Sequence, residues 1–208
     1  VEDRVKIHFM YPHDPEYAEE MSKETFDPHI STAIAMGLIT DEVGRAYVEK
    51  TLGTKERAEV AVFRDMAKPV NYLSVYGGTY KALMRQTGWD EQRCKDAIKA
   101  YWDKNWSVKA IAEEQVTIID SRNKEWLINP VNGFLYNIRS EKDRFSTLAQ
   151  GTGAFLFDMC LDDIITTMKE RWGRATLTAQ MHAELVIVCK DTQRIRKVMY
   201  DIIKGSVK

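Results

Sequence analysis

The sequence predicts an α+β fold that is mostly helical and carries two antiparallel hairpins. Along most of the chain, apolar residues recur at helical spacing between recognisable helix caps. The pattern changes to short strand-like runs at two places, around residues 126–138 and 176–189. With 208 residues and 44% hydrophobic content, the chain is long enough to bury a core of its own.

The first half of the chain is expected to be helical. In the first helix, Glu2 and Lys6 are placed on the polar side, opposite an apolar side. Asp27 and Pro28 open another helix as its N-cap and first-turn proline. The longest helix contains Pro69, which lacks a backbone donor and therefore predicts a kink. The expected helices cover residues 1–10, 27–37, 40–53, 54–76 and 90–119.

The second half of the chain contains both hairpins. Residues 129–133 form a turn sequence between two runs of strand-forming residues, which predicts the first hairpin. A long helix follows, and its interior Gly151 indicates close approach by another backbone or by a ligand. These later elements are expected at residues 143–172 (helix), 176–181 and 185–189 (hairpin), and 191–204 (helix).

Composition and charge exclude several classes of protein. The formal net charge is -1, so the chain lacks the overall positive field that many nucleic-acid binders carry. The three cysteines lie far apart, which argues against a disulfide framework or a zinc site. No apolar run is long enough to span a membrane and the N-terminus has no signal-peptide pattern, so we expect a cytoplasmic protein without a membrane partner. Because the chain begins without Met, in what reads as the middle of a helix, we expect a fragment.

One stretch combines cations and aromatic residues at a regular spacing. Arg64, Lys68, Tyr72 and Tyr76 recur every four residues, so on a helix they lie along one face. Guanidinium and ammonium groups on consecutive turns can bind a polyphosphate, and the aromatic rings can pack on a sugar or base. A glycine pair follows, which can end the helix and allow close backbone approach. The stretch therefore predicts a nucleotide site.

Four further short sequence motifs lie before and after this stretch. Together with it they are, in chain order, residues 1–10, Asp27-Pro-His29, residues 64–78, Gln150-Gly151, and residues 180–187, where Gln-Met-His-Ala-Glu precedes apolar residues. In this order they resemble motif A, the Asp-Ile-His element, motif B, a glutamine-glycine pair and motif C of family A DNA polymerases of the phage type. The resemblance covers nearly the whole chain, and it implies a right-hand polymerase fold of phage or bacterial origin.

The resemblance implies a fingers subdomain carried on an incomplete palm. Residues 15–120 would form the helical fingers, residues 1–14 the end of motif A in the palm, and residues 121–208 the palm with the motif C hairpin. The implied reaction is template-directed DNA synthesis, in which deoxynucleotides are added to a primer 3′ end.

The resemblance also assigns roles to individual residues of the nucleotide site. Arg64, Lys68 and His29 would bind the triphosphate of an incoming dNTP. Tyr72 would stack on its sugar and base. Glu2 would reject a ribose 2′-hydroxyl and would be held by Tyr76.

Three other residues would contact primer-template DNA near the primer end. They are Gln150, Gly77 and His182. Such contacts test the shape of a base pair, because minor-groove acceptors look similar for every correct pair.

Catalysis in this family is implied to use two Mg²⁺ ions, which need carboxylates converging from two places. The first of these aspartates would precede Val1, and Ala183 stands where the second is expected. Glu184 would be an accessory catalytic carboxylate, with His182 beside it. We therefore expect no metal site in this chain, no polymerisation by the chain alone, and a missing N-terminal polymerase segment as a partner.

Two alternatives stay open. A catalytically dead nucleic-acid-binding or assembly module with the polymerase fold would also explain Ala183. A single-subunit RNA polymerase has a similar motif B, but Glu2 and Glu184 favour DNA synthesis.

Overall fold

The structure, a computed structural model, describes the backbone of residues 2–172, 176–181, 184–188 and 192–206, and the side chains of residues 4–170, 187–188 and 192–206. The chain divides into two compact units, residues 1–151 and 152–208. None of the helices in the described ranges combines the length and the apolar character that crossing a membrane requires.

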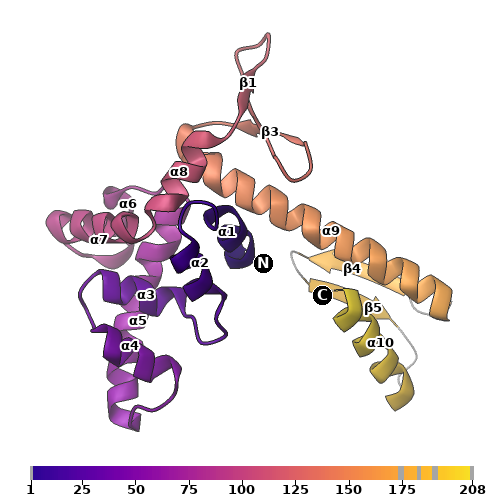
Figure 1. Ribbon diagram of the computed structural model, residues 1–208, viewed down its shortest axis with the longest axis horizontal. Helices are drawn as coiled ribbons and strands as arrows, with labels where there is room; N and C mark the ends of the chain where they lie inside the picture. The colour runs from indigo at the N-terminus through magenta and orange to yellow at the C-terminus, as the bar shows by residue number, and fades with distance from the viewer. Residues whose placement is uncertain (1, 173–175, 182–183, 189–191, 207–208) are drawn as a thin grey trace. The chain divides into compact units, whose positions relative to one another are not determined.

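The first unit contains eight helices of the described chain, a three-stranded sheet and the beginning of a long helix (Figure 1). The helices are α1 (Glu2–Met10), α2 (Pro15–Ser22), α3 (Pro28–Ala35), α4 (Asp41–Val48), α5 (Thr54–Val75), α6 (Tyr80–Thr87), α7 (Glu91–Lys104) and α8 (Trp106–Glu114). The strands are β1 (Thr117–Ile119), β2 (Glu125–Ile128) and β3 (Leu135–Ile138), followed by the 3-10 turn η1 (Glu141–Asp143) and by α9 (Arg144–Trp172).

Side-chain caps explain where several of these helices begin. The Asp27 carboxylate accepts hydrogen bonds from the backbone N–H groups of His29 and Ile30, as the Asp-Pro signal predicted. Asp14 caps α2 in the same way through the N–H of Tyr17. Helix α5 continues through Pro69, where we expected a kink; the kink itself stays a prediction.

The first hairpin is confirmed and is part of a larger sheet. Strand β2 pairs with β3 as predicted, and it also pairs on its other side with β1, giving the antiparallel order β1-β2-β3. In the turn, the Asn129 side chain accepts from the N–H of Val131. Gly133 adopts the left-handed region with φ of 72°, which the absence of a Cβ permits.

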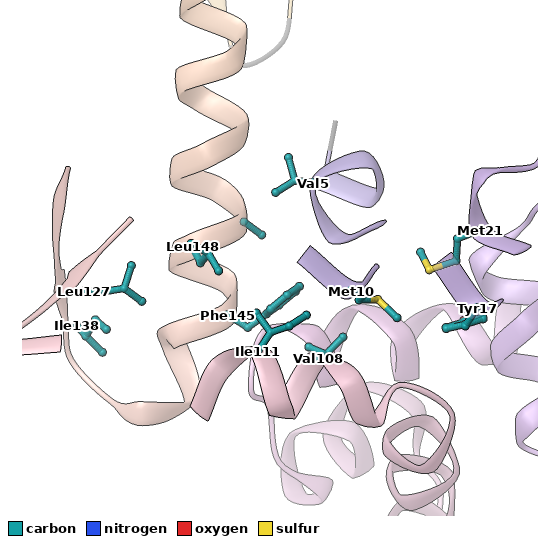
Figure 2. Packing of buried hydrophobic residues seen from close by; sticks show 11 residues of the cluster. Val5, Met10, Tyr17, Met21, Val108, Ile111, Leu127, Ile138, Phe145 and Leu148 are labelled. Carbon is teal, nitrogen blue, oxygen red and sulfur yellow. The ribbon is translucent and has the colours of Figure 1, made fainter. Parts of the chain in front are cut away.

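Two apolar clusters form the core of the first unit. The larger one joins α1, α2, α8, β2, β3 and the start of α9 (Figure 2). Burying each of its large apolar side chains contributes about 1.5–3 kcal/mol. Its members are Val5, Met10, Tyr17, Met21, Val108, Ile111, Leu127, Ile138, Phe145, Leu148 and Ala149. The smaller cluster holds α5 against α6 and α7 through Val70, Leu83, Cys94, Ala97 and Tyr101.

The second unit contains the rest of α9, a two-stranded sheet and a terminal helix. Strands β4 (Thr176–Met181) and β5 (Glu184–Val188) pair antiparallel, which confirms the second hairpin. Helix α10 (Gln193–Ser206) packs its apolar side on α9. The cluster between them is Ile164, Met168, Ile195, Met199 and Ile202.

Two expectations for the first unit are wrong. The helix expected over residues 90–119 is split at Asn105 into α7 and α8, and its last residues form β1. Lys6 is not on an exposed polar side but only 7% exposed, and its Nζ donates to Asn105 Oδ1 at 2.6 Å. Asn105, the partner of Lys6, also donates from its side chain to the Tyr101 carbonyl at the helix break.

Candidate functional site

Helix α5 places the predicted cations and aromatic residues along one face. The helix begins after Gly53, whose N–H donates to the Glu56 carboxylate. Lys68 is exposed and has no ion pair within the described part of the chain. Tyr72 and Tyr76 are 48% and 41% exposed, so both can contact a ligand. The periodicity read from the sequence therefore corresponds to a real surface.

Helix α3 brings His29 to this face. The two helices pack along each other (Figure 1). His29 is buried, with 6% of the residue exposed, and its ring Nδ1 lies 3.2 Å from Asn71 Nδ2. Its ring centroid lies 5.3 Å from that of Tyr72, with 55° between the ring planes. The structure thus places His29 next to Tyr72, two residues that are far apart in the sequence and that were both predicted to bind the nucleotide.

Arg64 is held by an ion pair that sequence analysis missed. Its Nε donates to Asp27 Oδ2 at 2.7 Å, and the two side chains are 29% and 20% exposed. This hydrogen bond, with the charge of Asp27, raises the pKa of Arg64 above its ordinary value. The guanidinium therefore stays charged and fixed at one edge. The Asp-Pro-His motif predicted that Asp27 caps α3. It gave no indication that Asp27 also pairs with Arg64.

A small pocket joins the C-terminal part of α5 to the start of α9. Its volume is about 50 Å³. Tyr72 and Tyr76 line it from α5, and Gln150 lines it from α9. The tyrosines predicted to bind the nucleotide and the glutamine predicted to contact the primer-template therefore line the same pocket. The full lining is Lys6, Asn71, Tyr72, Val75, Tyr76, Phe145, Ser146, Ala149 and Gln150.

Two glycines next to this pocket have close neighbours. Gly77 has φ of 69°, and a Cβ there would lie 2.8 Å from Lys142 Cβ. A Cβ at Gly151 would lie 2.6 Å from Cζ of Tyr136, whose hydroxyl donates to the Gly151 carbonyl. We expected another backbone or a ligand to approach the α9 glycines, but the close neighbour of Gly151 is the Tyr136 side chain of β3.

The remaining predicted residues fall where side chains are not described. Glu2 lies at the start of α1 and Glu184 at the start of β5. His182 and Ala183 lie outside the described residues. Within the described part of the chain no three His, Cys, Asp or Glu side chains converge as metal ligands. Ala183 offers no ligand atom for a metal, and we derive no catalytic step through Mg²⁺.

Comparisons with known proteins identify the family of this chain. The family model described as DNA polymerase family A matches residues 42–207. DNA polymerase I of Lactococcus lactis subsp. cremoris is 25% identical over 145 residues, which are 64% of this chain and 16% of that protein. DNA polymerase I of Bacillus subtilis is 27% identical over 158 residues, 71% of this chain and 18% of that protein. The chain thus spans less than a fifth of the length of either relative.

A solved structure shares the fold. The POL domain of Pol1 from M. smegmatis, in complex with DNA primer-template and dNTP, superposes with a TM-score of 0.67 at 14% sequence identity. The match covers 99% of this chain and 34% of that one.

Proposed function

This chain belongs to DNA polymerase family A, and from that premise we propose that it is the part of a DNA-directed DNA polymerase that binds the incoming nucleotide and the primer-template. The observation that carries the proposal is the face of α5, where an exposed lysine, a fixed arginine, two exposed tyrosines and a neighbouring histidine lie together. Subdomain limits at residues 14 and 120, with fingers between them, remain part of the proposal.

The phosphate end of the proposed site consists of Arg64, Lys68 and His29. Phosphoryl transfer leaves little covalent work to the protein, so positioned cations supply much of the stabilisation of the phosphates. Arg64 can bind phosphate oxygens through the N–H groups that Asp27 does not use. Lys68, one helical turn further on, adds a second positive charge.

The base end of the proposed site consists of Tyr72, Tyr76 and the pocket they share with Gln150. Tyr72 would stack on the sugar and base, and Tyr76 would hold Glu2 as the ribose gate. Gln150, Gly77 and His182 would contact the primer-template. The neighbourhood of Tyr76 and Gln150 supports this division, because the end of the primer and the incoming base must meet there.

We further propose that the chain by itself does not polymerise. Ala183 cannot ligate a metal, and Glu184 alone is a poor substitute for two converging carboxylates. The complete enzyme would hold two Mg²⁺ ions through carboxylates that residues outside this sequence supply.

A gel-shift comparison tests the proposal. The chain is mixed with primer-template, with and without the next correct dNTP. We expect the correct dNTP to tighten the complex and an incorrect dNTP not to do so. Equal binding in all three cases would contradict the nucleotide site.

That same result would favour a second candidate, a catalytically dead nucleic-acid-binding module, for which Ala183 is the specific observation. Primer extension separates the two further. Ala183→Asp in a parent polymerase that supplies the other carboxylates should restore extension, whereas a folded complex that stays inactive would support the non-catalytic module.

A further inference from the structure

We propose that Asp27 is a positioning residue that sets both His29 and Arg64 for binding the phosphates of an incoming nucleotide. This inference rests on the proposed function and deepens it, because it explains how two phosphate ligands from different helices are held in one arrangement.

Asp27 uses its two carboxylate oxygens for different partners. Oδ1 accepts from the backbone N–H groups of His29, at 2.9 Å, and Ile30, at 3.1 Å. Oδ2 accepts from Arg64 Nε at 2.7 Å. One side chain therefore ties the first turn of α3 to the middle of α5. A shift of either helix would stretch a short, charge-assisted hydrogen bond.

Arg64 is engaged through one edge of its guanidinium. Nε is used by Asp27, and Nη1 lies 3.9 Å from Asp65 Oδ1, which is too long for a hydrogen bond. Within the described part of the chain no further hydrogen bond occupies the Nη groups. A guanidinium fixed in this way keeps the N–H groups that bind phosphate and loses less conformational freedom when it does so.

His29 is fixed at two points. Asp27 anchors its backbone, and Asn71 lies at hydrogen-bond distance from its ring nitrogen Nδ1. Asp27 and Asn71 thus define the position and the rotation of the imidazole.

The negative charge of Asp27 would by itself repel a phosphate, but two positive groups lie next to it. The N-terminus of α3 contributes partial positive charge to it, and Arg64 contributes a full one. The raised pKa of Arg64 reflects the same coupling. The charge of Asp27 is therefore partly offset by the helix N-terminus and by Arg64.

A second capping aspartate in the chain, Asp90, can serve as a control that separates the N-cap function of Asp27 from its contact with Arg64. Asp90 caps α7 by accepting from the N–H of Arg93 at 2.9 Å. Within the described residues it forms no ion pair. Asp90→Asn therefore changes a capping aspartate without touching an arginine of the site, and asparagine remains a good N-cap in both variants.

The experiment uses the full chain with primer-template and the next correct dNTP. For wild type, Asp27→Asn and Asp90→Asn, the dissociation constant of the dNTP, the melting temperature and the hydrogen exchange of the Arg64 Nε–H by NMR are measured. We expect Asp27→Asn to weaken dNTP binding about tenfold and to speed the Arg64 exchange, while the two variants melt alike. Asp90→Asn should leave both the dissociation constant and the exchange unchanged.

The outcomes separate this role from the proposed function. A wild-type chain that binds no dNTP contradicts the proposed function and this role with it. A wild-type chain that binds dNTP, together with an Asp27→Asn variant that binds it equally or more tightly, contradicts only the positioning role. Unchanged exchange of the Arg64 Nε–H in Asp27→Asn contradicts that role as well.

Discussion

The two ends of the α5 face are held in different ways. At the phosphate end, Arg64 and His29 are set by polar partners, namely Asp27 and Asn71. At the base end, Gly77 is in close contact with another part of the backbone. The first arrangement depends on charge and tolerates changes of shape, whereas the second depends on shape and should not tolerate an added methyl group.

The largest expected effect is at the base end. Gly77→Ala adds a Cβ 2.8 Å from Lys142 Cβ at a residue with φ of 69°. We expect a loss of about 2–4 kcal/mol in the free energy of unfolding, from left-handed strain and overpacking together. Gly88→Ala is the control, since Gly88 has φ of 72° and nothing within 4 Å of a built Cβ. It should cost about 1–2 kcal/mol in chemical denaturation. Equal losses would show that close packing at Gly77 does not matter.

A second shape test concerns the glycine after Gln150. Gly151→Ala places a Cβ 2.6 Å from Tyr136 Cζ inside α9, so overpacking of about 1–3 kcal/mol opposes the roughly 0.5–1 kcal/mol that Ala gains over Gly in a helix. Adding Tyr136→Leu should relieve part of the clash, and the double variant should lose less than the sum of the two single variants. Strict additivity in denaturant titrations would argue against this contact.

A smaller effect is expected from replacing Lys6, the buried lysine that lines the base-end pocket. Lys6→Met keeps most of the volume but leaves Asn105 Oδ1 without its 2.6 Å donor. We expect a loss of about 1–3 kcal/mol, because a buried acceptor is left unpaired. Met at residue 6 combined with Asn105→Ala should recover part of this loss. A Lys6→Met variant as stable as wild type would mean that the polar pair contributes nothing.

The smallest effects on stability are expected at the phosphate end. Arg64→Ala breaks a partly exposed ion pair and should cost about 1 kcal/mol or less. Lys68→Ala removes an exposed cation that has no ion pair among the described residues, and the variant should stay within about 0.5 kcal/mol of wild type. Both variants should nevertheless weaken dNTP binding. A large loss of stability in Lys68→Ala, or unchanged dNTP binding in both, would remove the contrast between the two ends.

Local signals in the sequence predicted most of the elements, because those elements are specified locally. Asp27 with Pro28 and the spacing along α5 needed no knowledge of distant residues. Helix α2 was missed although Asp14 and Pro15 repeat the same cap signal, so that omission could have been avoided.

Other features depend on contacts between distant parts of the chain. At the helix break, Asn105 accepts a hydrogen bond from Lys6, 99 residues earlier in the chain. Strand β1 forms because β2 offers it a pairing edge, which overrides the local pattern. No local rule predicts such pairings.

The candidate site also combines a locally predictable feature with one that depends on distant residues. The face of α5 was predicted from the four-residue spacing of Arg64, Lys68, Tyr72 and Tyr76. The ion pair of Arg64 with Asp27 joins two helices and became visible only in the structure.

The central claim is that the α5 face binds a nucleotide chosen by a template. The most direct measurement is a titration of the chain, bound to primer-template, with the matched dNTP and with a mismatched dNTP. We predict that the matched dNTP binds at least about tenfold more tightly, and that Lys68→Ala weakens its binding. Equal affinity for matched and mismatched dNTP, or no binding of either, would contradict the claim.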